Sequence, residues 1–170
     1  ALAMSKTLKQ QVIIDNSPGA GGTIAAKKVM NAPKDGYTVL IHHIGMSTAP
    51  GLYKNLGYDP MTDFEHLGMV ADVPMVMVAN KDLPAKNLTE LLAYIKANGA
   101  KVNYANAGIG SASHLCGLLF MSAIQQDMTT VPYKGTAPAL TDLMGGQVQL
   151  MCDQTTNLAG QLKAGSVKPY

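Results

Sequence analysis

A run of seven residues combines glycines, serines and a histidine just before a long uncharged helical pattern: Gly108, Ile109, Gly110, Ser111, Ala112, Ser113 and His114. N–H groups at the start of a helix have no partner inside it, and the helix dipole favours an anion there. With two serine hydroxyls in the first turn, the run predicts a site for one carboxylate. His114 would add a donor, although a histidine near an apolar helix face is more often simply packed.

Two later loops occupy equivalent positions between a predicted strand and a predicted helix. The first is Tyr133-Lys134-Gly135-Thr136, and the second is Asp153-Gln154-Thr155. Ligands of open α/β sheets bind beyond the carboxyl ends of the strands, so we expect both loops on the rim of the same site. Lys134 fits an ordinary surface lysine equally well. Because Asp153 would repel an anion, we expect it to cap the following turn or to meet the polar tail of a ligand.

A third glycine-rich turn spans Asn16–Thr23 and contains Ser-Pro-Gly-Ala-Gly-Gly-Thr. Glycines let backbone N–H groups approach an anion at a helix N-terminus. The spacing matches neither the dinucleotide-binding fingerprint nor the P-loop, and no Lys-Ser or Lys-Thr pair follows. The sequence therefore favours a tight strand-to-helix connection here over an anion site.

The composition excludes several classes of protein. Hydrophobic residues make up 47% and charged residues 14%, which excludes intrinsic disorder. All 13 basic residues are lysines and the net charge is +2, which disfavours nucleic-acid binding. No apolar run is long enough to span a membrane. The four histidines show no metal-ligand spacing, and no nucleophile elbow is present, so we expect no metal, no cofactor and no enzyme.

Short apolar runs alternate with helical patterns, which predicts an α/β fold built from βαβ units. Strands are predicted at 12–14, 37–41, 67–70, 73–79, 102–105, 129–131, 148–151 and 167–170. Helices are predicted at 5–10, 22–31, 87–98, 111–126, 137–144 and 158–163, with one helical turn at 52–56. Asn87 and Glu90 form a capping-box pattern. The long extended stretch before residue 80 predicts a hinge between two lobes near Ala71–Pro74.

Two cysteines, Cys116 and Cys152, fit two buried thiols better than a disulfide, although pairing stays open.

Several blocks together resemble the Bug family, the periplasmic solute receptors of tripartite tricarboxylate transporters. The blocks cover nearly the whole chain in order: Val12–Asn16 with Pro18–Gly22, Asp35–Thr38, Tyr58–Pro60 with Asp63-Phe64, Asn103–Ala105 with Gly108–Ser111, Val131–Gly135, Pro138–Leu140 and Asp142-Leu143.

The resemblance implies a type II periplasmic-binding-protein fold with two doubly wound α/β lobes that close on a small carboxylate, a di- or tricarboxylate or an aromatic acid. Residues 1–72 would form an incomplete first lobe and residues 73–168 the second. The second-lobe ligand loop would be Gly108–Ser113, with Met46, Ser47 and Thr155 among the rim residues that set specificity. The implied partners are the membrane permease subunits, and the implied location is the periplasm, with a signal peptide upstream.

Two other functions share parts of this pattern. An effector-binding domain of a transcriptional regulator has the same two-lobe architecture, and a nucleotide-binding enzyme fragment would use the Gly19–Gly22 turn. The resemblance also implies that one carboxylate-gripping loop and the return of the first lobe lie outside this chain. We therefore expect an exposed sheet edge that promotes self-association of the chain.

Overall fold

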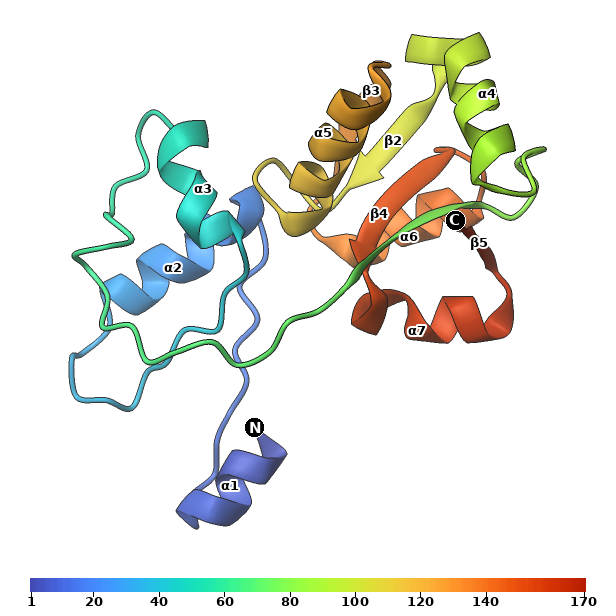
Figure 1. Ribbon diagram of the computed structural model, residues 1–170. Helices are drawn as coiled ribbons and strands as arrows, with labels where there is room; N and C mark the ends of the chain where they lie inside the picture. The colour runs from blue at the N-terminus through green and yellow to red at the C-terminus, as the bar shows by residue number, and fades with distance from the viewer.

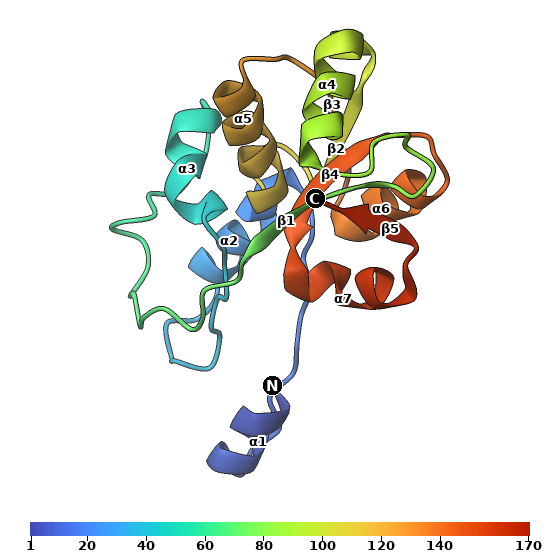
Figure 2. The same ribbon diagram turned by 45° about the vertical axis from the view of Figure 1, so that its right-hand side comes forward.

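The computed structural model describes residues 1–170 and has one five-stranded sheet, all of it formed after residue 74 (Figures 1 and 2). The elements in chain order are α1 (Leu2–Leu8), η1 (Ala20–Gly22), α2 (Thr23–Met30), α3 (Gly45–Leu52), β1 (Met75–Asn80), α4 (Leu88–Asn98), η2 (Gly99–Lys101), β2 (Asn103–Asn106), α5 (Ala112–Ile124), β3 (Thr129–Pro132), α6 (Thr136–Met144), β4 (Leu150–Gln154), α7 (Thr155–Ala164) and β5 (Val167–Pro169). No helix is both long and apolar enough to cross a membrane.

The sheet has the order β3-β2-β4-β1-β5. β2 runs parallel to β3 and β4, whereas β1 runs antiparallel to both of its neighbours, β4 and β5. The first residue of β1, Met75, pairs with Gln154 at the carboxyl end of β4. The chain therefore enters this sheet at the edge where parallel strands of an α/β fold present their ligand-binding loops.

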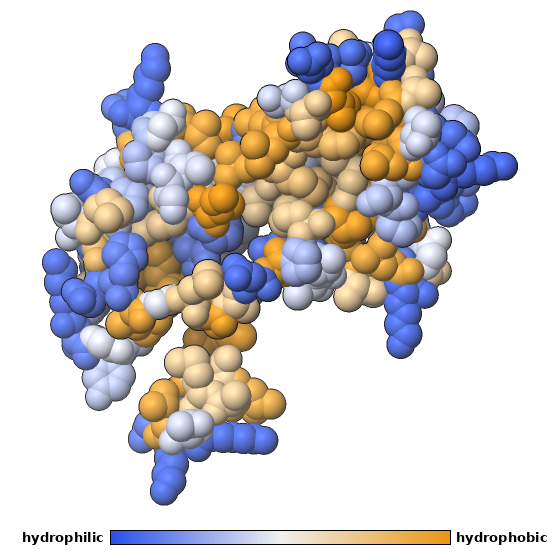
Figure 3. All heavy atoms as spheres, viewed as in Figure 1, coloured by the Kyte–Doolittle hydropathy of each residue, from blue (hydrophilic) through white to orange (hydrophobic).

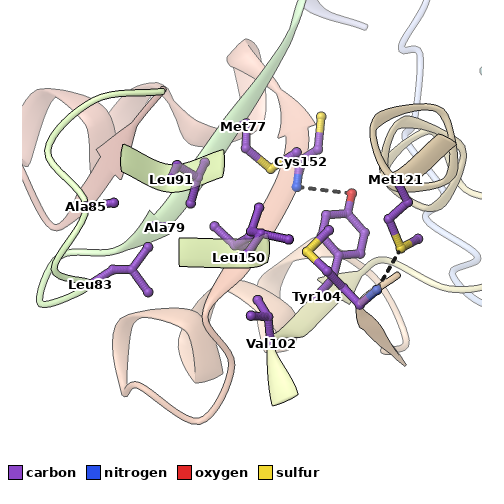
Figure 4. Packing of buried hydrophobic residues seen from close by; sticks show 12 residues of the cluster. Met77, Ala79, Leu83, Ala85, Leu91, Val102, Tyr104, Met121, Leu150 and Cys152 are labelled. Carbon is purple, nitrogen blue, oxygen red and sulfur yellow. Dashed lines mark hydrogen bonds between the residues drawn. The ribbon is translucent and has the colours of Figure 1, made fainter. Parts of the chain in front are cut away.

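Helices cover both faces of the sheet, and the alternation of side chains along the strands assigns each residue to one face. Along β4, Leu150 and Cys152 join the cluster under α4 and α5, while Met151 joins the cluster under α6 and α7. Leu91 and Ile95 are the fully buried positions of α4. Figure 4 shows the first of these clusters, with Tyr104 and Leu150 at its centre. This is the three-layer α/β arrangement that the sequence predicts.

Tyr104 anchors α5 to the sheet. Its ring is fully buried, and its hydroxyl donates to Ser113 O at 2.5 Å and accepts from Cys152 N at 3.2 Å. A disulfide joins Cys116 on α5 to Cys152 on β4, so the preferred interpretation of two buried thiols is wrong. The two cysteines lie 36 residues apart in sequence, but α5 packs directly across β4 and brings their Cα atoms within 6.1 Å.

The strands predicted at 12–14, 37–41 and 67–70 do not form, and this part of the prediction is wrong. A strand exists only with a hydrogen-bonded neighbour, and these segments pair with nothing in the chain. Most of their apolar side chains are exposed instead, Ile13 to 79%, although Leu40 packs against the small core of residues 1–72. The helical turn expected at 52–56 is also displaced, because the helix α3 ends at Leu52.

Residues 1–72 hold only a small core. Four buried residues, Ala26, Ala49, Leu56 and Tyr58, form their cluster between α2, α3 and the following loop, against twelve and nine in the two sheet clusters. The helix α1 projects away from the rest of the molecule, as the space-filling view shows (Figure 3). Most of the hydrophobic stabilisation therefore resides in residues 75–170.

Replacing Gly117 by alanine tests the packing of α5 on Tyr104. The new Cβ would lie 2.2 Å from Tyr104 Cε1, and the hydrogen bonds at the Tyr104 hydroxyl prevent the ring from moving away. We expect Gly117→Ala to lower the free energy of unfolding by about 1–3 kcal/mol in a denaturant titration. The matched control is Gly160→Ala at an exposed position of α7, where a Cβ meets nothing within 4 Å. This change should stabilise by about 0.5–1 kcal/mol, because alanine is the better helix former. Equal effects of the two substitutions would contradict this packing.

Candidate functional site

A cavity of about 200 Å³ opens where the helical part of residues 1–72 meets the loops after the parallel strands. Its lining is almost entirely uncharged: Pro18, Gly19, Gly21, Gly22, His43, Ala107, Ser111, Ala112, Ser113, Gly135, Thr136, Asp153, Gln154 and Asn157. The two views of the ribbon show the loop before α5 lying against the start of α2 and of α3 (Figures 1 and 2). The position agrees with the rule that open α/β sheets bind ligands beyond the carboxyl ends of their strands.

Four helices begin at this cavity. The N-cap residues of α5, α6 and α7 are Ser111, Gly135 and Gln154, and that of α2 is Gly22; all four line the cavity. Helix N-termini carry partial positive charge and unpaired N–H groups. No lysine lines the cavity, so these dipoles are its source of positive potential toward an anion.

The loop before α5 is held by its own side chains. Asn106 Oδ1 accepts from Gly108 N at 2.9 Å, and Ser113 Oγ accepts from Ala107 N at 2.7 Å. Ser111 Oγ caps the helix by accepting from His114 N at 3.2 Å, and it lies 3.0 Å from Ser113 Oγ. One hydroxyl hydrogen is shared between the two serines, which leaves the other free to donate. The N–H groups of Ala112 and Ser113 have no partner in the chain.

Of the seven residues predicted in this loop, the structure places Ser111, Ala112 and Ser113 on the cavity. Gly108, Ile109, Gly110 and His114 lie outside the lining. The Nδ1 atom of His114 accepts from Gly110 N at 3.3 Å, so this nitrogen serves the loop instead of a ligand. Burial lowers the pKa of His114, which keeps the ring neutral and able to accept at pH 7.

The second predicted loop contributes Gly135 and Thr136. Tyr133 lies outside the lining, and its hydroxyl donates to Asp142 Oδ2 at 2.7 Å. Lys134 is exposed and also lies away from the cavity. Met46 and Ser47, both on α3, do not line it either: Met46 packs against the small core of residues 1–72, and Ser47 is exposed.

Asp153 lies on the cavity with 3% of its surface exposed. Its Oδ1 accepts from Gln154 N at 2.7 Å and from Asn157 Nδ2 at 3.0 Å, and its Oδ2 accepts from the Thr136 hydroxyl at 2.6 Å. The carboxylate therefore ties the starts of α6 and α7 together, close to the capping role expected for it. The N–H of Thr155 donates to Pro74 O, and Thr155 does not line the cavity.

Sequence reasoning missed the contribution of residues 1–72. The glycine turn Gly19–Gly22, interpreted as a plain connection, faces the cavity. The signal was present in the glycine cluster, but its spacing matched no known fingerprint. Thr136 and Gln154 lie on the cavity, as expected from their places in the two predicted rim loops, whereas Asn157, in the first turn of α7, was missed.

His43 also lines the cavity, although no pattern in the sequence singles it out. Its Nδ1 accepts from Gly45 N at 2.9 Å, so the neutral ring carries its proton on Nε2 and can donate there. Burial and, to a smaller extent, the adjacent His42 lower the pKa of His43 to about 4, and the nearby Asp153 partly opposes them. At pH 7 the ring is a neutral donor.

Comparison with known proteins places this geometry in a family. Residues 1–169 match the tripartite tricarboxylate transporter family receptor, TctC. A UPF0065 protein from the TAR-I ttuE-ttuC' intergenic region of Agrobacterium vitis is 48% identical over 170 residues, which are 100% of this chain and 49% of the relative. The chain spans about half the length of the curated relatives it matches over nearly all of its own length.

Solved structures agree with this placement. The periplasmic binding protein BugD superposes with a TM-score of 0.95 at 53% identity, over 100% of this chain and 57% of BugD. MatC from Rhodopseudomonas palustris, solved with bound malate, superposes with a TM-score of 0.90 at 40% identity, over 98% of this chain and 57% of MatC. The fold is that of periplasmic binding proteins, and the chain belongs to the receptor family of the tripartite tricarboxylate transporters.

Proposed function

We propose that the protein is an extracytoplasmic receptor that captures a small carboxylate in this cavity and delivers it to a tripartite tricarboxylate transporter. The observation that carries the proposal is the convergence of four helix N-termini on a lining without lysine. Such a site stabilises an anion through backbone N–H groups and hydroxyls. MatC, which shares the fold, was solved with bound malate.

The donors available to a carboxylate lie together at the start of α5. They are the N–H groups of Ala112 and Ser113 and the free hydroxyl hydrogen of the Ser111–Ser113 pair. His43 Nε2–H adds a donor from residues 1–72. A carboxylate here would therefore bind donors from both sides of the cavity, which favours closure around it.

The buried carboxylate of Asp153 limits which ligands fit. One carboxylate bound near α5 is compatible with Asp153, but a second negative charge placed beside Asp153 would be repelled. We infer that the ligand directs its anionic end to α5 and a neutral or donor-bearing part toward Asp153 and Asn157.

The remaining assignments follow from the family and are part of the proposal. Residues 1–72 contribute to a first lobe and residues 73–168 form the second, with the hinge in the extended chain before β1. The parts of the first lobe outside this chain would pair with the exposed segments at 12–14, 37–41 and 67–70. The receptor would act in the periplasm, bind membrane permease subunits and catalyse no reaction.

The direct experiment is a calorimetric titration of the complete protein with a panel of mono-, di- and tricarboxylates, amino acids and aromatic acids. Saturable binding of one class, with no response to nucleotides, is the expected result. A folded protein that binds no carboxylate in the panel would overturn the proposal.

Replacing Ser111 tests the position of the anion. Aspartate and asparagine are both good N-caps, so Ser111→Asp and Ser111→Asn should keep α5 capped and the protein folded. Two carboxylates about 4 Å apart repel by about 4 kcal/mol at an effective dielectric constant of about 20. We therefore expect Ser111→Asp to weaken carboxylate binding at least about 100-fold, and Ser111→Asn far less. Equal affinities of the two variants would place the anion elsewhere.

Carboxylate binding beside His43 should take up protons below pH 7. A bound anion favours the imidazolium, so the pKa of His43 rises on binding from its value of about 4 in the free protein. Where the bound ring is partly protonated and the free ring is neutral, affinity increases as the pH falls from 7 toward 5. Calorimetry in two buffers of different ionisation enthalpy measures this uptake directly. His42 and Asp153 face the same ring, so the control is His43→Gln, which should abolish the uptake; uptake that persists in this variant would assign it to another group.

A further inference from the structure

We infer that Tyr53 is a positioning residue that holds the ligand loop from the opposite side of the cavity. The Tyr53 hydroxyl donates to Ile109 O at 2.6 Å across 56 residues of sequence. The N–H of the same peptide group, on Gly110, donates to His114 Nδ1 at 3.3 Å. The Ile109–Gly110 peptide is thus bound at both ends, by residues 1–72 through Tyr53 and by α5 through His114. This inference rests on the proposed carboxylate site.

The contact between the two parts of the chain is unusually close around this peptide. A Cβ on Gly21 would lie 2.4 Å from Ile109 O, and a Cβ on Gly45 would lie 2.6 Å from Gly110 O. Glycines at these two positions allow backbone to meet backbone, and Gly21 also adopts a left-handed φ of 61°. The carbonyls of Ile109 and Gly110 therefore face residues 1–72.

The loop geometry is linked to the ligand donors through the chain itself. Gly110 directly precedes Ser111, whose side chain caps α5 and whose neighbours Ala112 and Ser113 carry the free N–H groups. Rotation of the Ile109–Gly110 peptide would turn Ser111 relative to the cavity. Tyr53 reaches this peptide only while the two sides of the cavity are together, so closure and donor placement occur as one event.

The ring and the hydroxyl of Tyr53 make separate contacts: the ring also packs against the small core of residues 1–72, and the hydroxyl reaches the ligand loop. Tyr53 follows α3 and is half-buried, and its ring contacts the Gly110 position, where a Cβ would meet Cε2 at 3.4 Å. Phenylalanine keeps this ring contact and removes only the hydroxyl. Tyr37 is 91% exposed and its hydroxyl has no partner, so Tyr37→Phe is a matched control for removal of a hydroxyl.

The test compares Tyr53→Phe with Tyr37→Phe in the complete protein. One hydrogen bond contributes about 1 kcal/mol, which corresponds to a factor of about five in affinity. For Tyr53→Phe we expect a five- to tenfold weaker affinity for whichever panel carboxylate the wild type binds, carried by a faster dissociation rate with a nearly unchanged association rate. The ligand-free protein should stay folded, with a melting temperature lowered by at most about 2–4 °C, as the loss of one hydrogen bond allows, and Tyr37→Phe should change nothing.

A second readout needs no ligand. Hydrogen exchange at the Gly110 amide should be faster in Tyr53→Phe, because the peptide loses one of its two anchors. Wild-type affinity and unchanged Gly110 exchange in Tyr53→Phe would overturn the inference even if the receptor binds its carboxylate. Faster exchange in a protein that binds no carboxylate would instead overturn the proposed function and leave Tyr53 as an anchor of the loop only.

Discussion

The cavity contains no lysine, and the chain contains no arginine, so the donors that this chain offers to an anion there are neutral groups. Lysine and arginine side chains adapt to a ligand by rotating, whereas helix N-termini and backbone N–H groups are fixed by the fold. The orientation of α5 relative to the sheet therefore sets the direction of every donor at its start. Tyr104 fixes this orientation with hydrogen bonds to Ser113 O and from Cys152 N.

The direction of β1 determines which residues lie at the edge of the cavity. Four strands of the sheet share one direction, and β1 is inserted between β4 and β5 in the opposite one. Residues just before Met75 therefore lie beside Gln154 and Thr155 at the edge of the cavity, where Thr155 N donates to Pro74 O. A change in the conformation of the residues just before Met75 would therefore shift the first residues of α7.

The sequence predicted residues 73–170 well, because each strand there finds its partner within the chain. Asn87 caps α4 as expected, and Glu90 also accepts from Lys86 N, one residue earlier than a capping box requires. The apolar runs at 12–14, 37–41 and 67–70 have the right pattern for strands but no neighbour, and a local pattern carries no information about absent partners.

Site residues could be predicted where the order of strands and helices along the chain brings them to the cavity. They could not be predicted where contacts between distant segments bring them there. Ser111, Ser113 and Gly135 follow strands, Asp153 lies at the carboxyl end of one, and all four reach the cavity by topology alone. His43 reaches it only because α3 packs against the loop before α5, a contact that no spacing in the sequence reveals. Lys134 had a favourable position in the chain, but its side chain lies in solvent.

The disulfide has a consequence for the order in which the site is assembled. It connects the second turn of α5 to the residue just before Asp153. One covalent bond therefore joins the helix whose N–H groups face the cavity to the strand that places the Asp153 carboxylate there. Once oxidised, these two parts of the site keep their spacing whatever the position of residues 1–72. In the proposed receptor, the side of the cavity formed by α5 and β4 would therefore be in place before the ligand binds. Only the approach of residues 1–72 would then cost entropy on binding.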